Sequence, residues 1–407
     1  MIRKAARNTP LLSEVLASGS EQPPVGGDQA QGRESDTASL SVVITARNER
    51  EQIGSTVRSF LRQQYPGLEI IVVDDRSSDG TAEILDQLAS SPEAGGGRLQ
   101  VLHSRELPEG WIGKCHACHL GAQHTRGDWI LFTDGDVCLV DDRLLARVVT
   151  HAERHRFDHV AVIPDLTPMT AVQAGLVAAF GQLFLFAARA HEMDRDHARG
   201  GAGIGAFNLV RRSSYERVGG HRLLRMDLAD DFKLGRLLKE SGARQRLFNG
   251  LGLVRCRWHR GALGVLRGLE KNLFGGFDYA IWKLLAWTAA TATLNFGPAA
   301  IAALATLTRW GPGGWLLRGA AWLPLIAQTA LTVTAYIAEA RRYGAHPAVL
   351  TFLSPISCLL LIAAAWNSML RTLWRGGVLW RETFYPLALL KQGLVRPGVS
   401  GGSFSKR

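Results

Sequence analysis

The chain has 407 residues, of which 46% are hydrophobic and 20% charged, and its net charge is +11. These proportions exclude a wholly disordered chain, a collagen-like chain and a coiled coil, and five cysteines are too few for a disulfide-stapled secreted scaffold. The basic excess lies in residues 282–407, which hold 12 Lys or Arg against two Glu. Because this basic third is also the apolar third, we expect its partner to be a membrane and not nucleic acid.

Residues 1–39 show little hydrophobic periodicity, and the part from Ala17 to Ser39 is rich in Gly, Ser, Gln and Pro. A segment of this composition has few apolar side chains to bury, so residues 1–39 are predicted to be a disordered tail. They lack the central apolar run of a signal peptide, and none is expected.

From residue 40 onward, short β-branched runs alternate with apolar residues at helical spacing. The strand candidates are 41–45, 70–73, 99–102, 129–132, 160–163 and 207–210, and helices are expected after the first two. This alternation predicts an α/β domain over residues 40–281, with a mostly parallel sheet flanked by helices. In such a sheet the functional residues lie at the carboxyl ends of the strands.

The last third contains three long runs without Asp, Glu, Lys or Arg, at residues 284–308, 319–338 and 343–370. Each is long enough to cross a hydrocarbon core of about 30 Å. Three buried helices of a soluble domain are the alternative, which three such runs in succession disfavour. We therefore predict a transmembrane region over residues 282–373 and a basic C-terminal tail over residues 374–407.

The number of crossings is a separate question. Three crossings would place the tail opposite the front domain, whereas its arginines and lysines favour the cytoplasmic side. The run 284–308 is the suspected exception, because Asn295-Phe296-Gly297-Pro298 interrupts it, and it is expected to be re-entrant or interfacial. A fourth apolar run, Leu176–Ala188, is too short to span and is expected to lie at the membrane interface or in the core.

Three pairs of aspartates stand at positions suited to chemistry. Asp134 and Asp136 flank a glycine after the strand 129–132, and such a pair suits Mg²⁺ or Mn²⁺, although an acidic turn would look the same. The pair Asp74-Asp75 ends another strand, where a carboxylate can accept hydrogen bonds from a base or ribose. The pair Asp230-Asp231 opens a predicted helix, and it suits either the helix dipole or a general base.

Taken in order, these motifs resemble the family 2 inverting glycosyltransferases over roughly residues 40–260. The matching segments are Ser41–Glu49, Val73–Asp75 with Asp79–Thr81, Gly113-Lys114, Asp134–Asp136 and Asp230-Asp231. The resemblance implies the GT-A fold of nucleotide-diphospho-sugar transferases and a donor that is most often UDP-linked.

The resemblance also implies roles for single residues. The base is Asp231, beside Asp230, and the metal, Mg²⁺ or Mn²⁺, is held by Asp134 and Asp136. The residues implied in nucleotide-sugar binding are Ala46, Asn48, Glu49, Asp74, Asp75, Lys114 and Asp134. The chain departs from the usual family pattern at Thr45, Arg47 and His119.

The second half resembles a membrane-anchored branch of the family. Trp380-Arg-Glu-Thr-Phe-Tyr385 is similar to the signature of ceramide glucosyltransferase-like and carotenoid- or hopanoid-associated members, and Gly205–Arg212 looks like their acceptor-side segment. This implies a lipid acceptor and a multi-pass protein of the cell membrane with its catalytic domain in the cytoplasm. Because the signature faces the catalytic side in such members, it favours an even number of crossings.

Two alternatives remain open. Processive members carry a Gln-x-x-Arg-Trp string about 35 residues after the base, and that distance falls here on Arg267–Lys271, so single transfer is favoured over polymer synthesis. A nucleotidyltransferase shares the sheet architecture, but it would have a Gly-rich loop after the first strand. The string Cys115-His-Ala-Cys-His119 and the glycines of Gly201–Gly205 are interpreted as neither haem nor dinucleotide sites.

Overall fold

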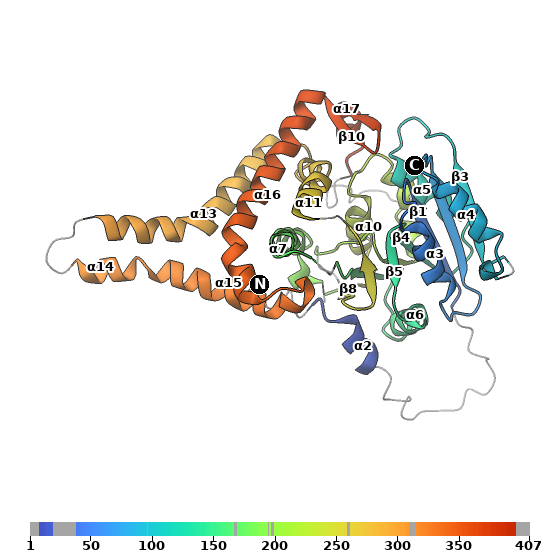
Figure 1. The fold of residues 1–407 in the computed structure, drawn as a ribbon, viewed down its shortest axis with the longest axis horizontal. Coiled ribbons are helices and arrows are strands. Elements are labelled where there is room, and N and C mark those ends of the chain that lie inside the picture. The colour runs from blue at the N-terminus through green and yellow to red at the C-terminus, as the bar shows by residue number, and fades with distance from the viewer. Residues whose placement is uncertain are drawn as a thin grey trace.

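The computed structural model describes residues 8–18, 38–95, 97–166, 169–193, 195–196, 199–258, 261–308 and 314–395. A seven-stranded sheet lies in the α/β part (Figure 1). Its strand order is β3-β2-β1-β4-β7-β6-β8. The strands are β1 (Leu40–Ala46), β2 (Glu69–Asp75), β3 (Leu99–Ser104), β4 (Trp129–Asp134), β6 (His159–Ile163), β7 (Asn208–Arg211) and β8 (Gln245–Asn249). Only β7 runs against its neighbours within this sheet, so the predicted mostly parallel sheet is confirmed.

Helices cover both faces of the sheet, which explains why all of β1 is buried. Val42 and Ile44 pack among residues of α3, α4 and α6, whereas Val43 faces the opposite cluster with residues of α5 and α10. The helices of this part are α3 (Ile53–Leu61), α4 (Thr81–Ala89), α5 (Gly113–Gln123), α6 (Leu144–Arg154), α7 (Ala171–Ala187), α8 (Arg212–Arg217), α9 (Gly220–Leu223), α10 (Asp230–Glu240), α11 (Gly261–Glu270) and α12 (Leu273–Gly276), with short 3-10 turns at Pro92–Ala94 and Ala190–Glu192.

The strand register brings the acidic strand ends together. In the parallel pair β1 and β4, Thr45 lies opposite Asp134, and in the pair β1 and β2, Ala46 lies opposite Asp74. A short antiparallel pair, β5 (Val137–Leu139) and β9 (Val254–Cys256), extends the same edge. The carboxyl edge of the sheet therefore carries the candidate residues, as predicted.

The N-terminal prediction is wrong for residues 8–18. This part forms α2 (Leu12–Ser18), and Leu12 and Leu16 are buried in the main core beside α6. These two leucines, four residues apart, lie on one face of a short amphipathic helix and anchor it in the core. The prediction missed them because it was based on the polar composition of residues 1–39 as a whole. Residues 1–7 and 19–37 of the predicted tail lie outside the described residues.

Among the described residues of the last third, three helices are long and apolar enough to cross a membrane: Ile281–Leu307, Trp315–Ile337 and Pro347–Arg375. The elements here are α13 (Ile281–Leu307), α14 (Trp315–Ala320), α15 (Leu323–Tyr343) and α16 (Pro347–Arg375). The expected interruption of the first run is not observed, because α13 continues through Pro298. Gln328 of α15 donates a hydrogen bond to the Asn295 carbonyl, so a neighbouring helix supports the backbone near the proline.

The three long helices differ in how they meet the α/β part. In Figure 1, α13 and the α14–α15 pair project away from the sheet together, whereas α16 runs beside α7 and α11. One third of the most apolar window of α16 is buried, against 11% for each of the other two. The short run Leu176–Ala188 belongs to α7, and it forms part of the packing surface for α16.

The segment after α16 is not a free basic tail, which corrects the prediction for residues 374–407. It forms a hairpin of β10 (Gly377–Trp380) and β11 (Thr383–Pro386), followed by α17 (Leu387–Gln392). Tyr385 and Leu390 are buried, so this segment folds back onto the α/β part. Residues 396–407 lie outside the described residues.

The close packing of α5 on the sheet gives a test of the fold. A Cβ at Gly121 would lie 2.4 Å from Val43 Cγ1 and 3.2 Å from Val73 Cγ2. Gly121→Val is expected to overpack this contact and to cost about 2 kcal/mol of unfolding free energy. Thermal unfolding of the purified protein should show a midpoint lowered by about 5 °C. Gly276→Ala, whose Cβ would meet no atom within 4 Å, should leave the midpoint unchanged, and equal midpoints for both variants would contradict this packing.

Candidate active site

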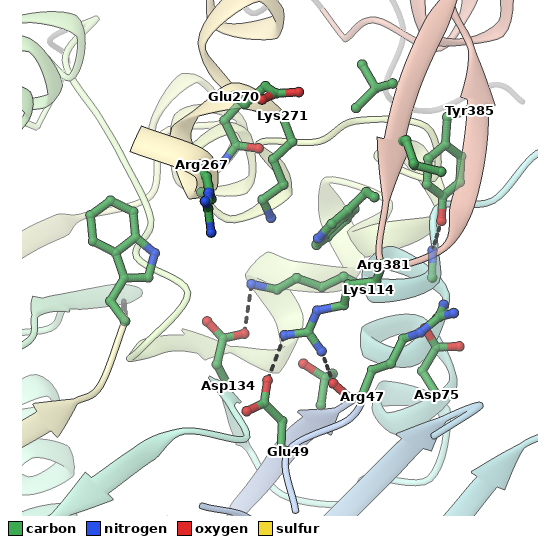
Figure 2. A pocket seen from close by; sticks show the side chains of 18 of the residues that line it. Arg47, Glu49, Asp75, Lys114, Asp134, Arg267, Glu270, Lys271, Arg381 and Tyr385 are labelled. Carbon is green, nitrogen blue, oxygen red and sulfur yellow. Dashed lines mark hydrogen bonds and ion pairs between the residues drawn. The ribbon is translucent and has the colours of Figure 1, made fainter. Parts of the chain in front are cut away.

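A cavity of about 660 Å³ opens at the carboxyl edge of the sheet (Figure 2). Its floor comes from the ends of β1, β2 and β4 and from the start of α5. One wall comes from α11, and the roof comes from the end of α16 and the β10–β11 hairpin. Cavities of this size hold small organic ligands.

Three of the predicted nucleotide-sugar residues line the floor at, or just after, the ends of β1 and β2. They are Ala46, Glu49 and Asp75. The Asp75 carboxylate is 2.8 Å from Arg76 Nε and 3.7 Å from Arg47 Nη1. The Glu49 carboxylate is largely enclosed, and burial raises the pKa of Glu49, although a neighbouring arginine opposes that shift.

Two other predicted residues, Asn48 and Asp74, do not line the cavity. The Asn48 side-chain oxygen accepts a hydrogen bond from the Ser78 backbone N–H at 2.8 Å, and Asn48 has a left-handed φ of 55°. One Asp74 carboxylate oxygen lies 3.1 Å from His103 Nδ1. Asn48 therefore braces the segment that carries Glu49, and Asp74 braces the end of β2 beside Asp75.

Lys114 and Asp134 form an ion pair in the cavity, with Nζ and Oδ1 2.8 Å apart (Figure 2). Lys114 stands in the first turn of α5, and Asp134 is the last residue of β4. Burial acts against the lysine charge, but Asp134 and the carboxylates of α10 outweigh it and hold the pKa of Lys114 well above its ordinary value.

Asp136 lies beside this pair and accepts a hydrogen bond from Cys256 Sγ at 3.4 Å. Burial, together with the nearby Asp134 and Glu49, raises the pKa of Asp136 to about 6. Asp134, Asp136 and Glu49 line the same cavity, and carboxylate oxygens are donors that suit a hard divalent cation. The residues present thus fit the predicted Mg²⁺ or Mn²⁺.

Gly205 is the point around which three candidate residues meet. A Cβ there would lie 2.8 Å from Asp134 Oδ2, 2.9 Å from Lys114 Nζ and 3.0 Å from Asp231 Oδ2. The Gly205 backbone N–H donates to Asp231 Oδ2 at 2.6 Å. Residues more than a hundred positions apart in the chain therefore share one small volume.

The glycines of residues 201–205, which look like part of a dinucleotide-binding loop, instead allow close packing of this loop against α10. A Cβ at Gly203 would lie 2.2 Å from the Asp231 carbonyl oxygen, and one at Gly235 would lie 2.0 Å from Gly203 N. Only glycines let this loop lie directly against the first turns of α10. The loop thereby orients the Asp231 side chain.

The two aspartates of α10 differ in their surroundings. Burial raises the pKa of Asp231, and the neighbouring Asp230 adds to the rise, while Lys114 opposes it. Burial would also raise the pKa of Asp230, but Lys114 and His221 outweigh it and lower that pKa. Asp231 is therefore the more basic carboxylate of the pair.

Asp230 belongs to a buried polar chain behind the cavity. His221 Nε2 lies 3.5 Å from Asp230 Oδ2, and His221 Nδ1 lies 2.9 Å from the Tyr215 hydroxyl. With Cys118, these form the group Cys118, His221 and Asp230, whose potential metal-ligand atoms all lie within 4.8 Å of one another. Burial raises the pKa of Cys118 well above its ordinary value, which keeps the thiol protonated and makes it a poor metal ligand.

The roof and the α11 wall supply further residues, to which the sequence analysis gave no individual role beyond the Trp380–Tyr385 signature. Arg381 is 2.6 Å from the Glu49 carboxylate, and the Tyr385 hydroxyl accepts a hydrogen bond from the Gly113 backbone N–H. Lys271 lies with Nζ 3.6 Å from the centre of the Trp380 ring, a cation–π contact. The sequence does contain a pattern that predicts this wall. Four of the lining residues follow helical spacing, at positions i, i+3, i+4 and i+7, and would therefore share one helix face: Gly264, Arg267, Gly268 and Lys271.

Comparison with known proteins bears on the predicted family resemblance. Residues 41–219 match the family model described as Glycosyl transferase family 2. The family match and the mostly parallel sheet together confirm the predicted resemblance and the GT-A class of fold.

The curated relatives agree with this. A 4,4'-diaponeurosporenoate glycosyltransferase of Staphylococcus haemolyticus is 27% identical over 59% of this chain and 62% of its own length. A protein of the same name from Staphylococcus aureus is 23% identical over 61% of this chain and 64% of its own length. The match thus spans about three fifths of these relatives. Among solved structures, a mannosyltransferase from Pyrobaculum calidifontis in complex with GDP-Man and Mn²⁺ aligns with a TM-score of 0.46 at 18% identity, covering 92% of this chain and 97% of the other.

The crowding at Gly205 can be tested directly. Gly205→Ala would place a methyl group among Asp134, Lys114 and Asp231 and displace these side chains by about 1 Å. The rate at which nucleotide is released from a nucleotide-sugar donor is expected to fall about 100-fold. Steady-state kinetics would measure this, and the unfolding midpoint should hardly change. Turnover equal to that of the Gly276→Ala control would show that the three side chains need not converge.

Proposed function

We propose that this protein is a membrane-bound inverting glycosyltransferase. It moves one sugar from a nucleotide-diphosphate donor, a UDP-sugar, to a lipid acceptor. The observation that carries the proposal is the meeting of Asp134, Lys114 and Asp231 around Gly205, at the carboxyl edge of a family 2 domain. A cation, a pair of metal-binding carboxylates and a base are the groups that such a displacement requires.

The donor lies across the floor of the cavity in this proposal. Ala46, Glu49 and Asp75 contact the nucleoside, while Asn48 and Asp74 act one step removed by bracing the neighbouring segments. Lys114 faces the diphosphate, where negative charge develops as the sugar leaves. A fixed ammonium group in an enclosed site stabilises that charge more than it would in water.

Asp134 and Asp136 would hold the divalent cation. When bound, Mg²⁺ or Mn²⁺ supplies positive charge to the departing diphosphate. The raised pKa of Asp136 supports this assignment, because carboxylates crowded together are stabilised by a cation that binds between them.

Asp231 serves as the general base for the acceptor hydroxyl. Its raised pKa makes it a better proton acceptor than an exposed aspartate, and the Gly205 and Phe232 backbone N–H groups fix its orientation. The lowered pKa of Asp230 keeps a second negative charge beside it. One base and one displacement suffice for inversion, so no covalent sugar–enzyme intermediate is required.

The acceptor is proposed to be a lipid, which the helices α13, α15 and α16 and the name of the relatives' substrate, 4,4'-diaponeurosporenoate, both favour. We place the enzyme in the cell membrane as a multi-pass protein with its catalytic domain in the cytoplasm. We further infer that α13 and the α14–α15 pair cross the bilayer while α16 lies along the domain. With two crossings, the chain returns to the side of the membrane on which the α/β part lies, so the β10–β11 hairpin can cover the cavity.

The base is tested by Asp231→Asn. The purified protein is incubated with labelled UDP-sugars, host lipid extract and Mn²⁺, and label in the lipid fraction is measured. The variant is expected to lose a factor of about 10² to 10⁴ in turnover with nucleotide binding retained. Asp86→Asn, an exposed carboxylate outside the cavity, is the matched control, and undiminished transfer by Asp231→Asn would remove Asp231 from the mechanism.

The metal is tested by chelation. Excess EDTA should abolish transfer, and Mn²⁺ or Mg²⁺ should restore it. Asp136→Asn should raise the metal concentration needed for half-maximal rate by about 10 to 100-fold, since one carboxylate ligand is lost. Full turnover in EDTA would exclude a metal requirement. Lys114 and the cavity arginines would then be the groups that stabilise the negative charge of the diphosphate.

A further inference from the structure

The cavity lining holds more cations than its acidic groups can pair. It includes eight Lys or Arg side chains and five Asp or Glu. Among the described residues, Arg47 pairs with Asp75, Lys114 with Asp134 and Arg381 with Glu49. Glu270 pairs with both arginines of α16, Arg371 at 3.2 Å and Arg375 at 3.7 Å.

Three cations of the lining remain without a carboxylate within 4.0 Å among the described residues. They are Arg257, after β9, and Arg267 and Lys271, on and just after α11. Figure 2 shows Arg267 and Lys271 pointing into the cavity from the side opposite Asp134. Burial, with Lys114 and Arg381 nearby, lowers the pKa of Lys271 to about 7. An unpaired cation in such a place is stabilised by an anionic ligand.

These cations lie between the proposed reaction centre and the apolar helices. Gly264, Arg267, Gly268 and Lys271 all line the cavity, whereas Val265 and Leu269 of the same helix are buried in the apolar cluster shared with α7 and α16. Trp258, beside Arg257, stacks on Phe180 of α7 with ring centres 5.7 Å apart. A molecule whose tail lies along α7 and α16 would thus present its polar head to these cations.

We propose that Arg257, Arg267 and Lys271 form a binding site for an anionic group, a carboxylate or a phosphate, on the lipid acceptor. This inference rests on the proposed function and narrows its substrate class to acidic amphiphiles. The donor diphosphate is the competing anion. It is assigned to the other side of the cavity, where Lys114 and the Asp134–Asp136 pair already provide for it.

The test uses the full chain in neutral detergent micelles with two probes. Quenching of tryptophan fluorescence by 9,10-dibromostearate is compared with quenching by its methyl ester, because Trp258 and Trp380 line the cavity. UDP binding in the presence of Mn²⁺ is measured by calorimetry. Competition by palmitate and by hexadecyl phosphate then distinguishes a carboxylate head from a phosphate head.

The wild type is expected to bind the acid at least tenfold more tightly than the ester. The double variant R267Q/K271Q should lose this preference while ester binding and UDP binding change less than twofold. R375Q, which removes a cation of the same cavity that Glu270 already pairs, should retain the preference.

Two results would overturn the proposal. Equal binding of acid and ester by the wild type would mean that no anion site faces the lipid. A tenfold loss of UDP binding in R267Q/K271Q, with the acid preference intact, would assign these cations to the donor. Failure of the proposed function would look different, because the wild type would then bind no UDP whatever its preference for the acid.

Discussion

The structure depends on one half-buried ion pair and the acidic groups around it. Lys114 Nζ lies 2.8 Å from Asp134, and Asp230 and Asp231 add negative charge from α10. Removing this many carboxylates from water is costly unless a cation lies among them. Lys114 supplies that charge from the start of α5, so β4, α5 and α10 must meet at one point. The glycines of the 201–205 loop make this approach possible.

The cavity is completed by a part of the chain that is remote in sequence. The roof comes from residues 377–386, and Arg381 binds Glu49 more than 300 residues away. Because α16 leads directly into this roof and packs along α7, the apolar helices and the reaction centre form one assembly. A lipid that approaches along those helices would therefore meet the proposed acceptor side of the cavity.

Much of the fold could be predicted because strands and helices follow local patterns. The β-branched runs ending in aspartates marked the strands, and parallel strand order brought Asp75 and Asp134 to one edge. Local patterns did not predict the structure correctly where contacts between distant parts of the chain determine it. Leu12 and Leu16 hold a helix in a segment of disordered composition, and α13 passes Pro298 without a break. Asn48 and Asp74 stand at family positions, yet their side chains turn to Ser78 and His103 and not to the cavity.

The sequence by itself determined the class of fold, the family 2 motifs, the apolar helices and most of the residues that line the floor. These depend on spacing along the chain, which periodicity and motif order record directly. Only the tertiary structure decided that the C-terminal segment forms a roof, that Gly205 lies among three charged groups, and that Arg257, Arg267 and Lys271 remain unpaired within the described residues. The pairing of a charge depends on which distant side chains reach it, and no local pattern carries that information.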